Sequence, residues 1–553
     1  MAGAKMLYQA RVWVSWVLVL WATSVSGQTP TVDPCAAGTS LPECLVVGID
    51  FTNELGEFRN IASGFNGHVD SEPFRPAAAH LEFNLKPRFW RGDSFCRTEH
   101  CEENVLQDRA YRAVIDNGGA YQKLGCKAFA ESYGYDCFTL ENVVTWDRSR
   151  DGEQWYRACY DEARDALSHG RDPQWDVWNE PDITPIFKDR NNDFMQFELA
   201  ETYRICFEGL VDAYADAGVS QQPVVGGPSI SAGPWGLVRF LFATGSPGQV
   251  YVAGSDLPGN RTGGYGSFGF LRYLNDRPDL RFDFMTLHIF TNESVMKWAH
   301  WLEIVRAAIR EEITAGGLDT LRQRWGDDLS GLPIYVNEMM GSPSDQEYYA
   351  AAGHSIVAIA EMHQARVAGA GKACWPDPGD GSEGCSNKTI SGLLVPDGSQ
   401  DPSGRRPVWW AYKYYAELQG REAAVESDYP RVAGVAAADI GQGKYRALLG
   451  FTAASADGEA GLTTDLIGRT RLDFRGLADC EDASVRLQWV SAPQFKAFDL
   501  SDLAVDELIP AAIVGGELAV GIAGLAAEDV LYVTIDTTAC PVPPEAPTGL
   551  RLR

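Results

Sequence analysis

The sequence predicts an α/β protein, a (β/α)8 TIM barrel followed by an antiparallel β-sandwich domain. Between about residues 59 and 420, short strand-like runs alternate with segments of helical periodicity, which is typical of a parallel α/β architecture. Eight such runs can be counted, the number that closes a barrel of this type. After residue 420 the helical periods stop, and alternating apolar and polar residues indicate antiparallel strands.

The eight predicted barrel strands are, in chain order, RNIASGFN, PRFWRGD, CKAFAES, WDVWNE, PVVGGPS, FDFMTLHIF, PIYVNEM and KACWP. Helices are predicted between them, with apolar residues at helical spacing over residues 194–214, 298–313 and 348–367. A doubly wound sheet is the structural alternative, but the sequence contains no P-loop motif that would support it.

These patterns divide the chain into domains. We expect the barrel to occupy residues 45–420 and the β-sandwich residues 421–540, where KYRALLGF, SVRLQWV and VLYVTIDT alternate. Residues 45–53 can instead supply a strand to the β-domain. Residues 541–553, PVPPEAPTGLRLR, read as a Pro-rich linker that enters the first strand of a fibronectin type III module.

The first 27 residues have the composition of a secretory signal peptide. Lys5 and Arg11 precede the apolar run VWVSWVLVLWA, and small residues then offer cleavage sites after Ser26 or Gly27. No later segment approaches the roughly 20 apolar residues that a membrane-spanning helix needs. We therefore expect a secreted protein, extracellular or periplasmic, without a membrane span.

Export changes the interpretation of the twelve cysteines, because an oxidising compartment favours disulfides. No CxxC motif indicates a zinc site. Proximity along the chain suggests three local pairs and one that ties the last domain together: Cys35–Cys44, Cys96–Cys101, Cys374–Cys385 and Cys480–Cys540.

The formal net charge is −28, from 75 acidic and 47 basic residues. Such an excess of negative charge argues against a general polyanion binder such as a nucleic-acid-binding protein. It does not exclude a local basic cleft. The simplest interpretation is a solvated acidic surface.

Two of the predicted strands end in an Asn-Glu pair. Glu180 ends the fourth strand in WDVWNEP, and Glu338 ends the seventh in PIYVNEM. Reactive groups of such barrels lie at the carboxyl ends of the strands, and strands four and seven face one another across the barrel mouth. Either glutamate alone can be explained as a helix cap or an arginine partner, but paired carboxylates about 5 Å apart are what retaining glycoside hydrolysis requires.

At these residues the chain resembles the retaining glycosidases of clan A, and most nearly glycoside hydrolase family 39, which includes β-xylosidases and α-L-iduronidases. The resemblance rests on VWNEP, VGGPS, MTLHIF, YVNE and GLLVPDG…RRPVWWAYKYY. It implies that Glu180 is the acid/base, that Glu338 is the nucleophile, and that Asn179 bonds the sugar hydroxyl beside the reacting carbon. It implies no metal or organic cofactor.

Three further residues are candidates for the same cleft. His288 in LHIF would lie beside Glu338 and hold its orientation, although a core histidine is the alternative. Trp375 in CWPDP would stack on a sugar ring or serve the core. Arg91 in FWRGD would bond Glu338 or a substrate hydroxyl, with Arg88 as the rival.

The sequence therefore predicts a secreted retaining glycoside hydrolase that acts on a polysaccharide or oligosaccharide, with β-xylosidase-like activity as the first hypothesis. An endo-acting clan A hydrolase of another specificity is the alternative enzyme. A catalytically inactive carbohydrate-binding protein is the alternative from another class. A serine esterase finds no support, because the sequence has no GxSxG motif.

Overall fold

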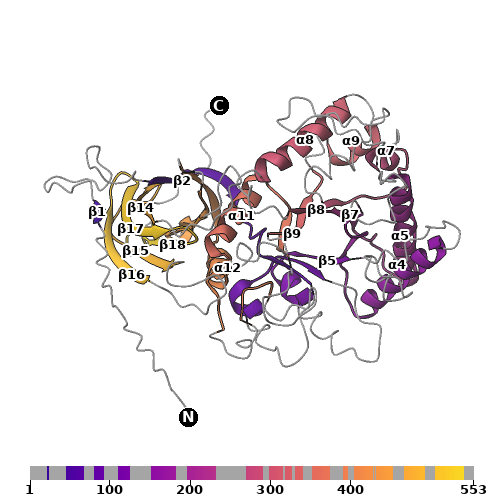
Figure 1. Ribbon diagram of the computed structural model, residues 1–553, viewed down its shortest axis with the longest axis horizontal. Coiled ribbons are helices and arrows are strands. Elements are labelled where there is room, and N and C mark those ends of the chain that lie inside the picture. The colour runs from indigo at the N-terminus through magenta and orange to yellow at the C-terminus, as the bar shows by residue number, and fades with distance from the viewer. Residues whose placement is uncertain are drawn as a thin grey trace, which may run out of the picture.

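The computed structural model shows a barrel and a β-sheet domain lying side by side (Figure 1). The residues that it describes are 21–23, 45–67, 80–92, 110–124, 151–181, 196–231, 270–289, 298–314, 318–326, 331–340, 351–373, 390–395, 404–427, 429, 431–452, 466–491 and 505–540.

Eight parallel strands close the barrel in the order β10-β3-β4-β5-β6-β7-β8-β9, which confirms the predicted fold class. Their bounds are β3 (Gly64–Asn66), β4 (Phe89–Gly92), β5 (Ala120–Leu124), β6 (Gln174–Asp176), β7 (Val225–Ile230), β8 (Phe284–Ile289), β9 (Ile334–Met339) and β10 (Gly369–Lys372). Because all eight strands run the same way, their carboxyl ends meet at one mouth.

Two strand predictions were wrong. The third strand is β5 rather than CKAFAES, which lies outside the described residues, and the eighth strand begins before KACWP. In β5 the polar Gln122 and Lys123 are buried, so the strand lacks an apolar pattern. In β10, a Cβ on Gly369 would lie 2.9 Å from the ring of Tyr335. The small residues that this packing requires give no strand signal.

Helices surround the barrel (Figure 1). The helices predicted for residues 194–214, 298–313 and 348–367 correspond to α5, α8 and α11. The bounds of the helical segments are η1 (His80–Leu85), α4 (Asp151–Ser168), α5 (Gln196–Asp216), α7 (Phe270–Asn275), α8 (Trp298–Thr314), α9 (Asp319–Trp325), α11 (Ala352–Gln364), α12 (Pro407–Glu417) and, in the sheet domain, η5 (Ile440–Gln442).

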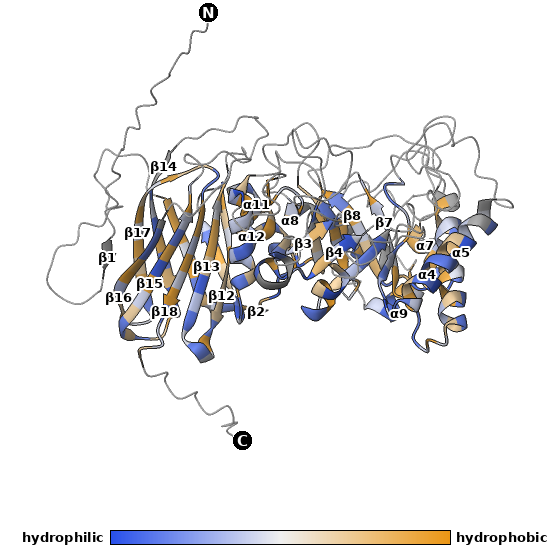
Figure 2. Cartoon of the chain, turned by 90° about the horizontal axis from the view of Figure 1, so that it is seen from below, coloured by the Kyte–Doolittle hydropathy of each residue, from blue (hydrophilic) through white to orange (hydrophobic). Residues whose placement is uncertain are grey.

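The second domain is a ten-stranded sheet in the order β1-β17-β14-β2-β11-β12-β13-β18-β15-β16. Its bounds are β1 (Trp21–Thr23), β2 (Leu45–Glu57), β11 (Arg421–Ser427), β12 (Val432–Asp439), β13 (Lys444–Phe451), β14 (Leu466–Arg475), β15 (Cys480–Val490), β16 (Val505–Ile513), β17 (Glu517–Ala526) and β18 (Val530–Asp536). Hydrophobic and hydrophilic residues alternate along its strands (Figure 2), as expected when one face is buried.

The sheet curves around a single core. Val47 and Leu472 come from the neighbouring strands β2 and β14, Val485 and Val533 from the distant pair β15 and β18, and all four belong to one buried cluster. The pairings are antiparallel except that β2 and β14 run parallel. Strand β2, which precedes the barrel in the chain, thus lies in the middle of the sheet.

Helix α11 joins the two domains. The amide N–H of His354 donates to Glu528 Oε2 at 2.8 Å, so a side chain between β17 and β18 caps the start of this barrel helix. A Cβ on Gly353 would lie 2.4 Å from the carbonyl oxygen of Phe451. Only glycine therefore allows the helix to approach the sheet this closely.

Two disulfides stabilise the described residues. The predicted Cys480–Cys540 bond is confirmed, while Cys159–Cys206, which joins α4 and α5, was not predicted. The cysteines of the other three predicted pairs lie outside the described residues.

The predicted signal peptide contains the short strand β1, whose backbone pairs with β17. None of the helices in the described part of the chain is long and apolar enough to cross a membrane.

Candidate active site

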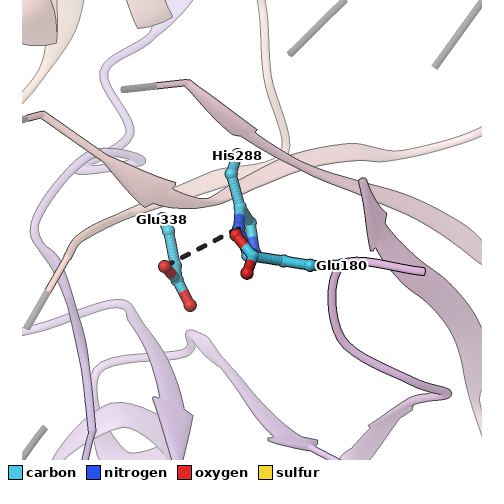
Figure 3. A group of neighbouring side chains, drawn as sticks. All are labelled: Glu180, His288 and Glu338. Carbon is cyan, nitrogen blue, oxygen red and sulfur yellow. Dashed lines mark hydrogen bonds and ion pairs between the residues drawn. The ribbon is translucent and has the colours of Figure 1, made fainter. Parts of the chain in front are cut away.

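Glu180, His288 and Glu338 come together at the carboxyl end of the barrel strands (Figure 3). Glu338 is the last residue but one of β9, His288 is the last residue but one of β8, and Glu180 lies shortly after β6. His288 and Glu338 are direct partners in the register of β8 and β9. Residues separated by 50 to 158 positions in the chain thus share one mouth.

The two carboxylates are close neighbours. One ligand atom from each of Glu180, His288 and Glu338 can be chosen so that all lie within 4.8 Å of one another. The two glutamate side chains are 14% and 15% exposed, whereas His288 is fully buried. Both carboxylates can therefore meet a ligand that enters the mouth.

His288 contacts both carboxylates but lies nearer to Glu180. Its Nδ1 is 2.8 Å from Glu180 Oε1 and 3.6 Å from Glu338 Oε2. The sequence predicted contact with Glu338 alone. A proton on Nδ1 is donated to Glu180, so His288 can orient that carboxylate.

Arg91 connects several groups beneath the mouth. Its Nη1 donates to Glu338 Oε1, its Nη2 donates to Asn179 Oδ1 at 2.6 Å, and its Nε donates to Asp176 Oδ2 at 3.0 Å. The guanidinium is almost fully buried, and charge-assisted bonds of this kind restrict its orientation. The rival Arg88 instead directs its Nη2 to the carbonyl of Gly118 at 3.5 Å.

Asp176 is the central acceptor of a polar network that was not predicted from the sequence. Besides Arg91 Nε, this fully buried carboxylate accepts hydrogen bonds from Ser229 Oγ at 2.5 Å, Asn337 Nδ2 at 2.8 Å and Thr286 Oγ1 at 2.9 Å. A buried carboxylate is tolerated when its oxygens are paired in this way. The sequence could have indicated this network, because Asp176 is an acidic residue in a predicted buried strand, and such a residue needs polar partners.

The backbone near the mouth adopts conformations that non-glycine residues rarely take. Trp178, Glu180 and Ser229 have positive φ angles of 84°, 48° and 56°. The N–H of Glu180 donates to the carbonyl of Ser229 at 2.9 Å, which holds the turn after β6 against β7. Unusual backbone conformations of this kind cluster at functional sites.

The same three side chains have the ligand types of a small metal site. However, the guanidinium of Arg91 already donates to Glu338 Oε1, and its positive charge would oppose a cation bound there. The contacts favour a pair of carboxylates held by hydrogen bonds over a metal centre.

The structure thus brings together Glu180, Glu338, Asn179, His288 and Arg91, five of the six predicted site residues. The sixth, Trp375, lies outside the described residues.

By sequence, the chain matches no protein-family model and no curated protein. Its structure is similar to a glucosidase from Croceicoccus marinus, with 13% identity, a TM-score of 0.58, and 89% of this chain and 99% of that chain covered. A monomeric β-xylosidase from Caulobacter crescentus CB15 has 14% identity and a TM-score of 0.53 over 89% of this chain and 99% of that one.

The family 39 glycoside hydrolase enzyme from Xanthomonas axonopodis pv. citri is also similar, with 14% identity, a TM-score of 0.52, and coverage of 89% of this chain and 97% of that one. At these identities the likeness concerns the fold. The predicted resemblance to family 39 of clan A is therefore confirmed in the fold, over the barrel and the sheet domain together.

Proposed function

We propose that the protein is a retaining glycoside hydrolase in which Glu180 is the general acid and base and Glu338 is the nucleophile. The observation that carries this proposal is the approach of the two carboxylates at the carboxyl mouth of the barrel, where one oxygen of each lies within 4.8 Å of the other. Retaining glycosidases hold their carboxyl groups about 5–5.5 Å apart, whereas inverting enzymes leave about 6.5–9.5 Å for a water molecule.

In the proposed first step, a Glu338 oxygen attacks the anomeric carbon while Glu180 gives its proton to the glycosidic oxygen. The C–O bond to the leaving group breaks, and a glycosyl ester forms on Glu338. In the second step, Glu180 removes a proton from a water molecule that attacks the same carbon. The ester bond then breaks, and Glu338 leaves as a carboxylate.

Neighbouring residues have distinct roles in this proposal. Arg91 donates to Glu338 Oε1, which fixes the orientation of the nucleophilic carboxylate. His288 lies 2.8 Å from Glu180 and orients the acid. Asn179, held by Arg91 at 2.6 Å, would bond the hydroxyl beside the reacting carbon.

The substrate is proposed to be a polysaccharide or oligosaccharide, with β-xylosidase-like specificity as the first hypothesis. The Caulobacter crescentus protein of similar fold is a β-xylosidase, which supports this choice. Trp375 would stack on a sugar ring. The predicted signal peptide and the two disulfides support secretion.

The test is hydrolysis of a panel of aryl glycosides and polysaccharides by the wild-type protein and three variants. Glu338→Ala should abolish turnover of every substrate. Glu180→Ala should slow most those substrates whose leaving group needs protonation. Glu481→Ala, which removes an exposed carboxylate from β15, is the control and should retain full activity.

The anomeric form of the first product, followed by NMR, tests the stereochemistry. Retention would support double displacement, and inversion would contradict it. Equal, small losses in Glu338→Ala and Glu180→Ala would reject both assignments. Saccharide binding without hydrolysis of any substrate would favour an inactive carbohydrate-binding protein.

A further inference from the structure

A second candidate binding site lies at the opposite end of the barrel from Glu180 and Glu338. A cavity of about 220 Å³ opens beside Pro333 and Ile334, where β9 begins. Three arginines line it: Arg59 before β3, Arg306 in α8, and Arg366 between α11 and β10. The remaining lining residues are apolar or glycine, and none of the described lining residues is acidic.

These arginines make few close ion pairs with carboxylates among the described residues. Within the described ranges, no ion pair involves Arg59 or Arg366. Arg306 approaches Glu303 only at 3.9 Å, whereas Glu303 pairs with Arg310 at 2.5 Å. In a chain with 75 acidic residues, a cavity lined by three such cations is not explained by a general excess of basic residues.

The Arg306 guanidinium also contacts the backbone of Arg366. Arg306 Nη2 donates to the carbonyl oxygen of Arg366 at 3.3 Å. The pKa of Arg306 is lowered, mainly by burial, with contributions from the positive charges of Arg310 and Arg366. A bound anion would relieve this repulsion.

We propose that this cavity binds a small oxyanion, either a free inorganic ion or the sulfate or carboxylate group of a sugar. A planar guanidinium matches the oxygens of such groups with paired hydrogen bonds. The volume admits an ion or one acidic sugar but not a polymer. A larger groove of about 700 Å³ between the barrel and the sheet domain shares Arg59 and Arg366, and gives an attached sugar ring room to extend.

Carboxylates restrict the anion to the smaller cavity. Glu57, Glu361 and Glu422 line the larger groove but not the cavity of the three arginines. An anion placed in the larger groove would meet these side chains at close range and be repelled or require their protonation.

The test is calorimetric titration of the full chain with sodium sulfate, sodium phosphate and sodium glucuronate, at an ionic strength held constant with sodium chloride. Wild type should bind at least one of these oxyanions saturably. Arg366→Gln and Arg59→Gln should each weaken that binding roughly tenfold or more, because a hydrogen bond to a charged group is worth about 1.5–3 kcal/mol. Arg157→Gln removes an exposed arginine that pairs with Glu153 on α4, and is the control.

Each outcome either identifies the source of the bound anion, a sugar or a free inorganic ion, or rejects the site. Tighter binding of glucuronate than of sulfate and phosphate would identify a sugar-borne anion, and the reverse a free ion. Saturable binding of equal strength in wild type, Arg366→Gln, Arg59→Gln and Arg157→Gln would place the anion elsewhere and overturn the proposal. Absence of saturable binding would also overturn it. A uniform rise in Tm with sulfate would not count as binding, because sulfate stabilises proteins by exclusion.

The arginine variants should leave hydrolysis of aryl glycosides unchanged, since the cavity lies at the amino end of the strands and the two glutamates at the carboxyl mouth. Failure of the anion site and failure of the proposed glycosidase activity are therefore separate results.

Discussion

Glu361 offers a quantitative test of how burial controls stability in this protein. This residue of α11 is 5% exposed, and its Oε2 accepts a hydrogen bond of 2.9 Å from the N–H of Ala299, near the start of α8. Burial raises the pKa of the Glu361 carboxyl from 4.5 to about 7, and the Ala299 bond opposes this increase. The folded state therefore holds the proton more tightly than the unfolded chain does.

The direction of the pH dependence follows from that difference. The stabilisation that protonated Glu361 contributes is complete below pH 4.5, the unfolded value, and is lost as the pH rises toward about 7. With about 1.4 kcal/mol for each pKa unit, the loss is about 3 kcal/mol. This is an upper value, because the positive end of the α8 dipole also favours the charged carboxylate.

Glu361→Gln should remove this dependence, because the amide keeps an acceptor for the Ala299 N–H but carries no charge. At pH 8 the variant should exceed wild type in free energy of unfolding by up to about 3 kcal/mol, and at pH 4 the two should agree. Urea unfolding followed by tryptophan fluorescence measures both values, and Glu481→Gln, an exposed position, is the control. A variant less stable than wild type at pH 8 would refute the reasoning.

Three further predictions follow from individual contacts. Asp176→Asn should lower kcat of the proposed hydrolase about 100-fold with little change in KM, because loss of this buried charge releases the guanidinium that holds Glu338, the proposed nucleophile, at a cost of about 3 kcal/mol; unchanged kcat would contradict that role. Gly353→Ala should lower the free energy of unfolding by about 1–3 kcal/mol, since its Cβ would lie 2.4 Å from the Phe451 carbonyl oxygen; an unchanged Tm would show that the domains move apart freely. Cys480→Ser with Cys540→Ser should cost about 4 kcal/mol for a sequence separation of 60 residues; equal stability of the double variant and the oxidised wild type would show that the bond contributes nothing.

Apolar runs in the sequence correctly predicted the barrel strands that are mostly apolar. The runs PIYVNEM and FDFMTLHIF contain β9 and β8, because burial on both faces of a parallel sheet favours apolar residues along most of a strand. The same rule failed for β5 and β10. In β10, the ring of Tyr335 on the adjacent strand β9 leaves no room for a side chain at Gly369.

The barrel, the sheet domain and the segments that carry Glu180 and Glu338 could be predicted from the sequence, because the signal for each strand or helix lies within a short segment of the chain. The sequence did not predict that His288 lies nearer to Glu180 than to Glu338, or that Asp176 organises the groups beneath them. Such contacts depend on the register of several strands and on the direction of their side chains. No single segment of the chain contains that information.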